Sequence, residues 1–529
     1  MASRSNGEMK MSGTSKKTGM IVAAALVLAG GGLVLHLSRE NPAATAPAAP
    51  RDNKTLIVAR PADIFTFDAF NTQDDRSMFT QLTVFERLVK LSADGKSVEP
   101  ELATEWTVAP DGMSATFKLR EGVKFWNGNL LTAKDVVFSL TRAIDQKGSW
   151  GFLFSPIKVV EAVDPQTVRI VMSEPFAPLL PALSTFAASI YEEANFVGQG
   201  AAAGEHPMGT GAFMLESWNR GQNVVMTANP TYWQSGKPSI GKLIFRVVGD
   251  EAARTLQLAS GDIQVATDVP ANQIDQITAA GGKVVTVPGS SVGFVTMNHK
   301  VKPFDQAAVR CALAWAVDRE SIAKSIYFGR AHAAKSILPT STFFYDSETS
   351  PIGFDLKKAR ELLASSTVPK GFSFTATVPS GDNTKLSIAQ IWAAGLAQIG
   401  VTMNIEQVEA TTAQEMYNTE KFTMRISAWT NDTPDPDQLM GVALDYRPQN
   451  ALHSSYRNDT ALNMVLAGRS ELDPAKRQTI YTDLQKLINH DCPFIYTVEE
   501  DRIFATSPRV TNFTPNSQGK YSFENTNLN

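Results

Sequence analysis

The stretch that decides the fold reads DGMSATFKLREGVKFWNGNLLTAKDVVFSLTR, residues 111–142. Residues 116–120 alternate apolar and polar side chains with the two-residue period of a half-buried strand. A second short strand is predicted for residues 123–126, and the Asn127-Gly128 pair that follows is a strong signal for a hairpin turn. The first half of the stretch therefore predicts β structure.

The second half of the stretch predicts a helix that begins at Thr132. Thr132 and Asp135 occupy the two positions of a capping box, with Asp in place of the usual Glu or Gln. Four apolar side chains then share one helical face: Val136, Val137, Leu140 and Ile144. Strands followed by an amphipathic helix indicate a mixed α and β unit.

This stretch resembles the signature of the family 5 extracellular solute-binding proteins, the peptide, dipeptide and nickel binders of bacterial ABC importers. The resemblance rests on TFKLREGVKFWNG and TAKDVVFSLTRA, although the family usually has His-Asp where this chain has Trp126-Asn127. Further elements resemble the family in the same order along the chain: residues 207–233, 251–262, 298–319, 354–366, 388–409 and 471–497.

The resemblance covers about residues 55 to 510 and implies an α/β fold. The expected architecture is a two-lobed periplasmic binding protein fold with a hinge, in which lobe I carries an inserted subdomain. Motif order places the boundaries as follows: an export signal or membrane anchor with a linker at 1–50, lobe I at 51–89, 207–293 and 500–529, the inserted subdomain at 90–206, and lobe II at 294–499.

The first 50 residues are predicted to direct export. Basic residues precede GMIVAAALVLAGGGLVLHL at 19–37, which holds no charged residue. This length lies between a signal-peptide core and a membrane span, so a cleaved signal and an uncleaved inner-membrane anchor are both open. Residues 42–50 form a Pro-Ala linker, and no Cys follows the apolar run to carry a lipid. We expect a periplasmic protein.

Composition limits the class of partner. A chain of 529 residues with 43% hydrophobic and 19% charged residues is typical of a soluble protein with two or three domains. The net charge is −4, and the first 50 residues contribute five Lys and Arg against two Asp and Glu, so the remainder is more acidic. Without a basic cluster, we expect no nucleic-acid partner.

The sequence offers little catalytic or metal-binding chemistry. The six histidines show no paired metal-ligand spacing, and no Walker A lysine is present, so we expect no metal, no cofactor and no ATPase activity. GSSVG at 289–293 matches the nucleophile elbow formally, but a strand pattern follows Ser291 where the elbow needs a helix. We therefore expect a binding protein, with a serine hydrolase as the rival from another class.

The most functional-looking segment is ISAWTNDTPDPDQLM, residues 426–440, where a strand runs into an acidic, Pro-broken loop. Ligands of open α/β sheets bind beyond strand carboxyl ends. In the family's peptide-binding members a similar W-x-x-D places its carboxylate against the peptide's α-ammonium. Trp429, Thr430, Asn431 and Asp432 match that pattern. Asp435 and Asp437 are instead predicted to be solvent-exposed caps of the next helix.

The partner of a ligand carboxylate is less evident. Dipeptide binders commonly carry an Arg in the loop that here reads VPSGDNTKLS, residues 378–387; this chain has only Lys385 there. On the facing lobe, FDAFNTQDDRS at 67–77 corresponds to the family's ligand-lining loop, with candidates Phe70, Asn71 and Gln73.

We expect a monomer that captures a di- or oligopeptide and delivers it to an inner-membrane ABC permease. Other solutes stay open: an opine, a nickel chelate, or an oligosaccharide stacked on Trp429, Trp150 and Phe154. The two cysteines, Cys311 and Cys492, could form one bridge, but the helical pattern around Cys311 favours a free buried thiol.

Overall fold

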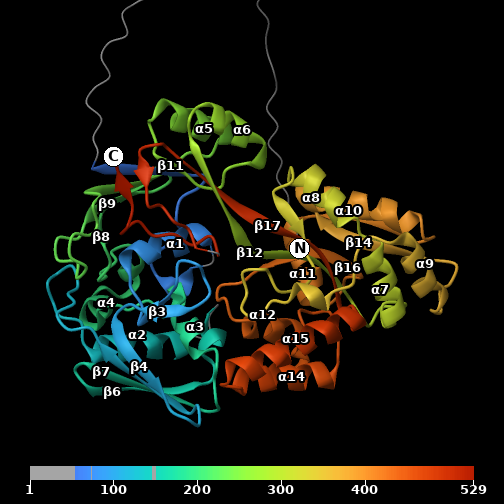
Figure 1. Cartoon of the computed structure of the whole chain (residues 1–529), viewed down its shortest axis with the longest axis horizontal. Coiled ribbons are helices and arrows are strands. Elements are labelled where there is room, and N and C mark those ends of the chain that lie inside the picture. The colour runs from blue at the N-terminus through green and yellow to red at the C-terminus, as the bar shows by residue number, and fades with distance from the viewer. Residues whose placement is uncertain (1–53, 73, 146–149, 517) are drawn as a thin grey trace, which may run out of the picture. The chain divides into compact units, whose positions relative to one another are not determined.

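A computed structural model describes residues 54–72, 74–145, 150–516 and 518–529 (Figure 1). The predicted export segment and its apolar run lie outside these residues. None of the helices in the described part combines the length and the hydrophobicity that a membrane span needs.

The largest sheet is mixed and runs in the order β15-β14-β16-β12-β17-β11-β1-β10-β9-β8, with β13 also paired to β17. Its strands are β1 (Thr55–Arg60), β8 (Phe213–Asn219), β9 (Asn223–Ala228), β10 (Lys242–Val247), β11 (Val265–Ala266), β12 (Lys283–Met297), β13 (Ala331–Ala333), β14 (Ser373–Pro379), β15 (Thr402–Val408), β16 (Met424–Thr430) and β17 (Phe494–Thr506). Parallel pairs such as β1 with β10 and β14 with β15 occur beside antiparallel ones.

A separate four-stranded antiparallel sheet, β4-β5-β7-β6, contains the strand predicted for residues 116–120. Its strands are β4 (Ala103–Val108), β5 (Ser114–Leu119), β6 (Ile157–Asp164) and β7 (Thr167–Met172), and the small sheets add β2 (Val89–Leu91), β3 (Val98–Pro100), β18 (Val510–Thr511) and β19 (Asn527–Leu528). The strand predicted for 123–126 is reduced to one bridge between Lys124 and Leu130, because the next donor of the ladder, the Ala133 N–H, bonds to the Pro165 carbonyl at 2.9 Å instead.

Helices flank both sheets, as Figure 1 shows, which confirms the predicted α/β class. They are α1 (Asp75–Val84), α2 (Ala133–Asp145), α3 (Leu179–Leu183), α4 (Glu193–Gln199), α5 (Glu251–Ser260), α6 (Ile274–Ala279), α7 (Ala307–Trp315), α8 (Arg319–Ile326), α9 (Leu356–Ala364), α10 (Asn383–Ala397), α11 (Ala410–Asn418), α12 (Asp437–Leu444), α13 (Tyr446–Gln449), α14 (Asp459–Ser470) and α15 (Pro474–Asp491).

The predicted start of α2 is confirmed. The backbone N–H and the hydroxyl of Thr132 both donate to Asp135 Oδ2 at 2.9 Å, so the carboxylate satisfies a donor at the helix start. Val136 and Leu140 are fully buried, while Val137 and Ile144 pack at the edge of the same core.

Two long strands join the halves of the large sheet. β12 and β17 pair along most of their length, with a register break between Pro288 and Val292. Val285 and Val287 pack against the core that contains β1 and β10, whereas Val295 belongs to the core around α7 and α10. The break therefore lies where the chain passes from one core to the other.

The cysteines are paired, which corrects the prediction of a free thiol at Cys311. Cys311 on α7 and Cys492 at the end of α15 form a disulfide with a Cα–Cα distance of 5.3 Å. Their separation of 181 residues hides this proximity from local pattern reasoning. The pairing arises because β17, which follows Cys492, returns to β12, which precedes α7.

His299 gives the fold a testable dependence on pH. Its ring donates from Nε2 to the Pro493 carbonyl at 3.2 Å and packs edge-on against Tyr456. Burial, followed by the positive charge of Arg310, lowers the pKa of His299 to about 3. Because the unfolded chain binds this proton near pH 6.5 and the folded chain does not, stability is lost as the pH falls below about 6.5.

We expect wild-type protein to lose about 2 kcal/mol more unfolding free energy than His299→Gln between pH 7 and pH 5, since each unit below the unfolded pKa costs roughly 1.4 kcal/mol. Urea unfolding at both pH values measures the difference. Replacement of the exposed His206 by Gln is the control and should leave the pH dependence of wild type unchanged. Parallel pH profiles for wild type and His299→Gln would show that this histidine does not carry the effect.

Candidate functional site

The loop after β16 is held firmly in place. β16 pairs with β12, and at its end the Asn431 N–H donates to the Ser290 carbonyl at 2.8 Å. The Asn431 amide donates to Thr342 Oγ1 at 3.1 Å, and the Asp432 N–H donates to Gln438 Oε1 at 2.9 Å. These bonds fix the direction in which the Asp432 side chain leaves the backbone.

The Asp432 carboxylate is half-buried at the end of this strand. Its Oδ2 accepts from Gln438 Nε2 at 2.7 Å, and burial raises the pKa of Asp432 to about 6 against the attraction of Lys520. The Lys520 ammonium, on the C-terminal segment, donates to the backbone carbonyl of Asp432. Beside them, the Arg502 guanidinium pairs with Asp75 at the start of α1. Charged groups from three distant parts of the chain therefore meet at this loop.

Two more polar atoms of the segment are buried without a hydrogen-bond partner in the described residues. They are Trp429 Nε1 and Asn431 Oδ1. The Trp429 ring packs on the core of α12 and α15, and Thr430 is exposed at the strand end opposite Ser291. Buried polar groups normally find partners, so these two atoms beside Asp432 are available to bond a ligand or a water.

The prediction of solvent exposure for Asp435 and Asp437 is wrong. Asp435 is 1% exposed and pairs through both oxygens with Arg477 of α15, at 2.5 and 2.8 Å. Asp437 is also buried and pairs with Arg469 of α14 at 3.0 Å. Burial raises the pKa of Asp437 to about 6, with the attraction of Arg469 opposing it. Both carboxylates therefore tie the loop to helices that sequence patterns could not connect with it.

The other candidates from the sequence have partners of their own. Lys385 Nζ pairs with Asp382 at 2.6 Å within the first turn of α10. Phe70 is 4% exposed, with the Arg142 guanidinium 4.2 Å from its ring centre. The exposed Asn71 donates its amide to Asp68 Oδ2 at 2.7 Å. Gln73 lies outside the described residues. The structure thus brings Lys520, rather than Lys385, to Asp432.

The aromatic residues considered for stacking a sugar are engaged elsewhere. Phe154 is fully buried in the core. Trp150 packs edge-on against Phe186 and donates its Nε1 to the Thr72 carbonyl at 2.7 Å. Phe154 therefore cannot stack a sugar together with Trp429 and Trp150, because its ring has no exposed face.

Ser291 lies inside β12, paired with Thr430 of β16. The strand continues to Met297, so the sharp strand-to-helix turn of a nucleophile elbow is not formed at this serine. The described residues also contain no group of three or more His, Cys, Asp or Glu side chains placed to hold a metal ion.

Two cavities lie near these segments. One of about 840 Å³ lies between residues 94–106 and 177–181 on one side and 340–345 and 472–477 on the other, and its wall includes Trp106, Phe343 and Phe344. Its volume is within the range of about 300 to 1,000 Å³ that is usual for ligand pockets.

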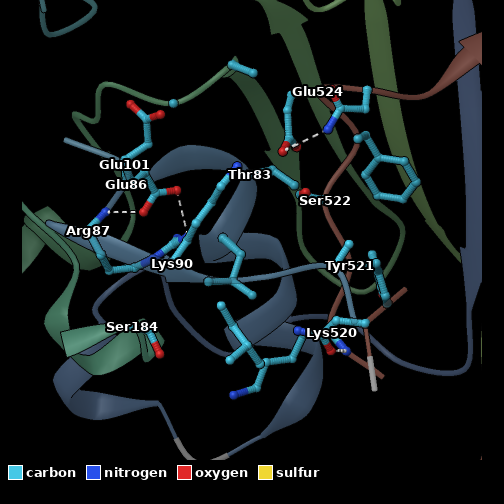
Figure 2. Close-up of a pocket in the computed structure, with 18 of the residues that line it drawn as sticks. Thr83, Glu86, Arg87, Lys90, Glu101, Ser184, Lys520, Tyr521, Ser522 and Glu524 are labelled. Carbon is cyan, nitrogen blue, oxygen red and sulfur yellow. Dashed lines mark hydrogen bonds and ion pairs between the residues drawn. The ribbon is translucent and has the colours of Figure 1, made fainter. Parts of the chain in front are cut away.

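The other cavity, of about 250 Å³, lies between the end of α1 and the C-terminal segment 514–525 (Figure 2). Figure 2 shows Lys520 and Glu524 on the side of that segment, opposite Glu86, Arg87 and Glu101. The sequence analysis missed this side of the site, because residues 514–525 carry no recognisable motif and reach it only through the return of the chain along β17.

Comparisons with known proteins identify relatives of this chain. The family model described as bacterial extracellular solute-binding proteins, family 5 middle, matches residues 97–450. The chain is 29% identical over 486 residues to the glutathione-binding protein GsiB of Shigella dysenteriae, covering 90% of this chain and 94% of that protein.

Two solved structures extend the comparison. The periplasmic binding protein DppA of Helicobacter pylori, in complex with the peptide STSA, has a TM-score of 0.76 at 26% identity, over 90% of this chain and 98% of that one. The binding protein AgaA of A. tumefaciens R10, in complex with agropinic acid, has a TM-score of 0.76 at 25% identity, over 90% and 99%. They confirm the predicted two-lobed periplasmic binding protein fold.

Proposed function

Because the chain belongs to the bacterial extracellular solute-binding proteins of family 5, we propose that it captures a peptide-like solute between its two lobes and delivers it to an inner-membrane ABC permease. The observation that carries the proposal is the half-buried carboxylate of Asp432, which follows β16 and accepts a hydrogen bond from Gln438 of α12. Such a group suits a solute with a free amine, because a buried ammonium needs a charged partner. The protein acts by binding and release, without catalysis.

The hinge of this proposal is the register break of β12 and β17. At Gly289 a Cβ atom would lie 2.2 Å from the Glu500 carbonyl oxygen, so the strands approach each other too closely for any side chain there. Strands that cross once between two cores can bend at such a point while each core stays intact. The proposed lobes are 51–89, 207–293 and 500–529 for lobe I, with subdomain 90–206, and 294–499 for lobe II.

The export segment completes the proposal. Proteins of this family are extracellular solute-binding proteins. We assign residues 1–50 to export, with residues 19–37 either removed with the signal or kept as an anchor, and the folded part to a monomer. A protein isolated from the periplasm that begins after residue 50 would identify the cleaved form.

Ligand should close the lobes as rigid bodies. The closing free energy comes from tighter binding to the closed state, so saturating solute should reduce the radius of gyration measured by small-angle X-ray scattering. Circular dichroism should not change. The solute itself can be identified by mass spectrometry of whatever the denatured protein releases. Scattering curves that coincide with and without a solute bound by calorimetry would contradict the closure mechanism.

A further inference from the structure

Lys520 and Asp432 are half-buried, opposite charges that attract each other without forming a direct ion pair. The Lys520 ammonium donates to the backbone carbonyl of Asp432, not to its carboxylate. Within the described part of the chain, Lys520 forms no ion pair, and neither does Asp432. Burial lowers the pKa of Lys520 to about 8 and raises that of Asp432 to about 6, so their mutual attraction offsets only part of the cost of burial.

The neighbouring charged residues that the structure describes do not form an ion pair with Lys520 or Asp432 either. Asp75 also attracts Lys520, but its carboxylate is taken by Arg502. Arg87 repels Lys520 and is itself paired with Glu101. The Lys520 ammonium can therefore still bind an anionic group of a ligand, and the Asp432 carboxylate can still bind a cationic one. The two residues are neighbours, so one ligand could reach both.

We propose that this site takes an amino-acid head group, in which an ammonium and a carboxylate sit on the same carbon atom. The ammonium binds Asp432 and the carboxylate binds Lys520, so a single dipolar group compensates both half-buried charges. This inference rests on the proposed function and narrows its solute class to γ-linked peptides and opine-like acids. An ordinary α-peptide has an amide carbonyl beside its terminal ammonium, which leaves the Lys520 charge without a partner.

The cavity beside Lys520 has room for the part of the solute that follows the head group. Lys520 and Gln518 both line the cavity of about 250 Å³ in Figure 2. Gln518 is 2% exposed, and neither its Nε2 nor its Oε1 has a hydrogen-bond partner in the described residues. A buried amide with a free donor and a free acceptor matches a linking amide of the solute. The volume is below the usual range for a whole ligand, so it suits a side arm next to the head.

The test compares γ-glutamylalanine with α-glutamylalanine, isomers of the same composition and charge, by calorimetry on the protein stripped of bound solute. We expect wild type to bind the γ-linked isomer at least tenfold more tightly. Lys520→Met should weaken the γ-linked isomer at least tenfold and abolish the preference, while Lys520→Arg, which keeps the charge, should retain a preference. Replacement of the exposed Lys324 of α8 by Met is the matched control and should behave as wild type.

Equal affinity of wild type for both isomers, or a preference that survives in Lys520→Met, would overturn the inference. So would failure of both isomers to bind protein that still closes, by scattering, around the solute that copurifies with it. In that case the proposed function stands and only the head-group assignment falls. If no copurifying solute and no peptide produces closure, the proposed function fails as well. Thermal unfolding of each variant separates loss of binding from loss of folding.

Discussion

Asp432→Asn is expected to weaken the binding of an amine-bearing solute by roughly 30-fold to several thousand-fold. Removing one partner of a buried charge pair typically costs about 2 to 5 kcal/mol, which converts to that range. Asn keeps the shape of Asp and can still accept a hydrogen bond from Gln438, so the substitution removes the charge and little else. Calorimetry with the copurified solute measures the change.

The pH dependence of binding identifies the charge as the cause. Burial raises the pKa of Asp432 to about 6, in a setting where Lys520 attracts and Asp75 repels the carboxylate. The solute ammonium needs the ionised form, so wild-type affinity should fall up to tenfold for each pH unit below about 6. Asp432→Asn has no such carboxylate, and its weaker affinity should stay flat over that interval.

Acetylating the amine of the solute gives the matching change on the other partner. It should reproduce the loss on wild type and add little to Asp432→Asn, as coupled partners do in a double-mutant cycle. Asp437 is unsuitable as the control because it is buried against Arg469. Asp483→Asn removes an exposed carboxylate of α15 instead. Affinity of Asp432→Asn within threefold of wild type would remove the amine-anchor assignment.

Local features of this fold were predictable because their causes are local. The start of α2 depends on Thr132 and Asp135, three residues apart, and the end of α5 on Gly261, whose φ of 84° is a left-handed conformation that glycine adopts freely. These capping signals involve residues that are no more than about one helical turn apart in the sequence. The order of several family-like elements then indicated the architecture, although the second predicted strand, 123–126, shrank to a single bridge.

The site depends instead on contacts between distant segments. Lys520 reaches the Asp432 loop from 88 residues away, and Arg477 reaches Asp435 from 42. No period or turn signal records such a meeting. Lys385 was a reasonable candidate by position, yet the first turn of α10 places it three residues after Asp382, and this local ion pair takes its ammonium. The sequence therefore indicated one side of the candidate site, the W-x-x-D segment, and missed the Lys520 cation beside it.

Removal of the disulfide should cause a large loss of stability. Cys311 and Cys492 close a loop of 181 residues, and restricting so long a loop in the unfolded chain accounts for about 5 kcal/mol on the chain-entropy model. Native disulfides typically contribute about 2 to 5 kcal/mol when measured. The double variant Cys311→Ser, Cys492→Ser should therefore unfold at a clearly lower urea concentration than wild type.

The reduced wild type provides the control for the two serines. Cys311 and Cys492 are 8% and 1% exposed, so reductant should act only after partial unfolding, and should then move the wild-type urea transition to that of the double variant. The same reductant should leave the double variant unchanged, because it has no bridge to break. Since the bridge joins α7 to the end of α15 within the proposed lobe II, it should stabilise that lobe without opposing closure. Coincident unfolding curves for oxidised wild type and the double variant would show that the bridge does not contribute this stability.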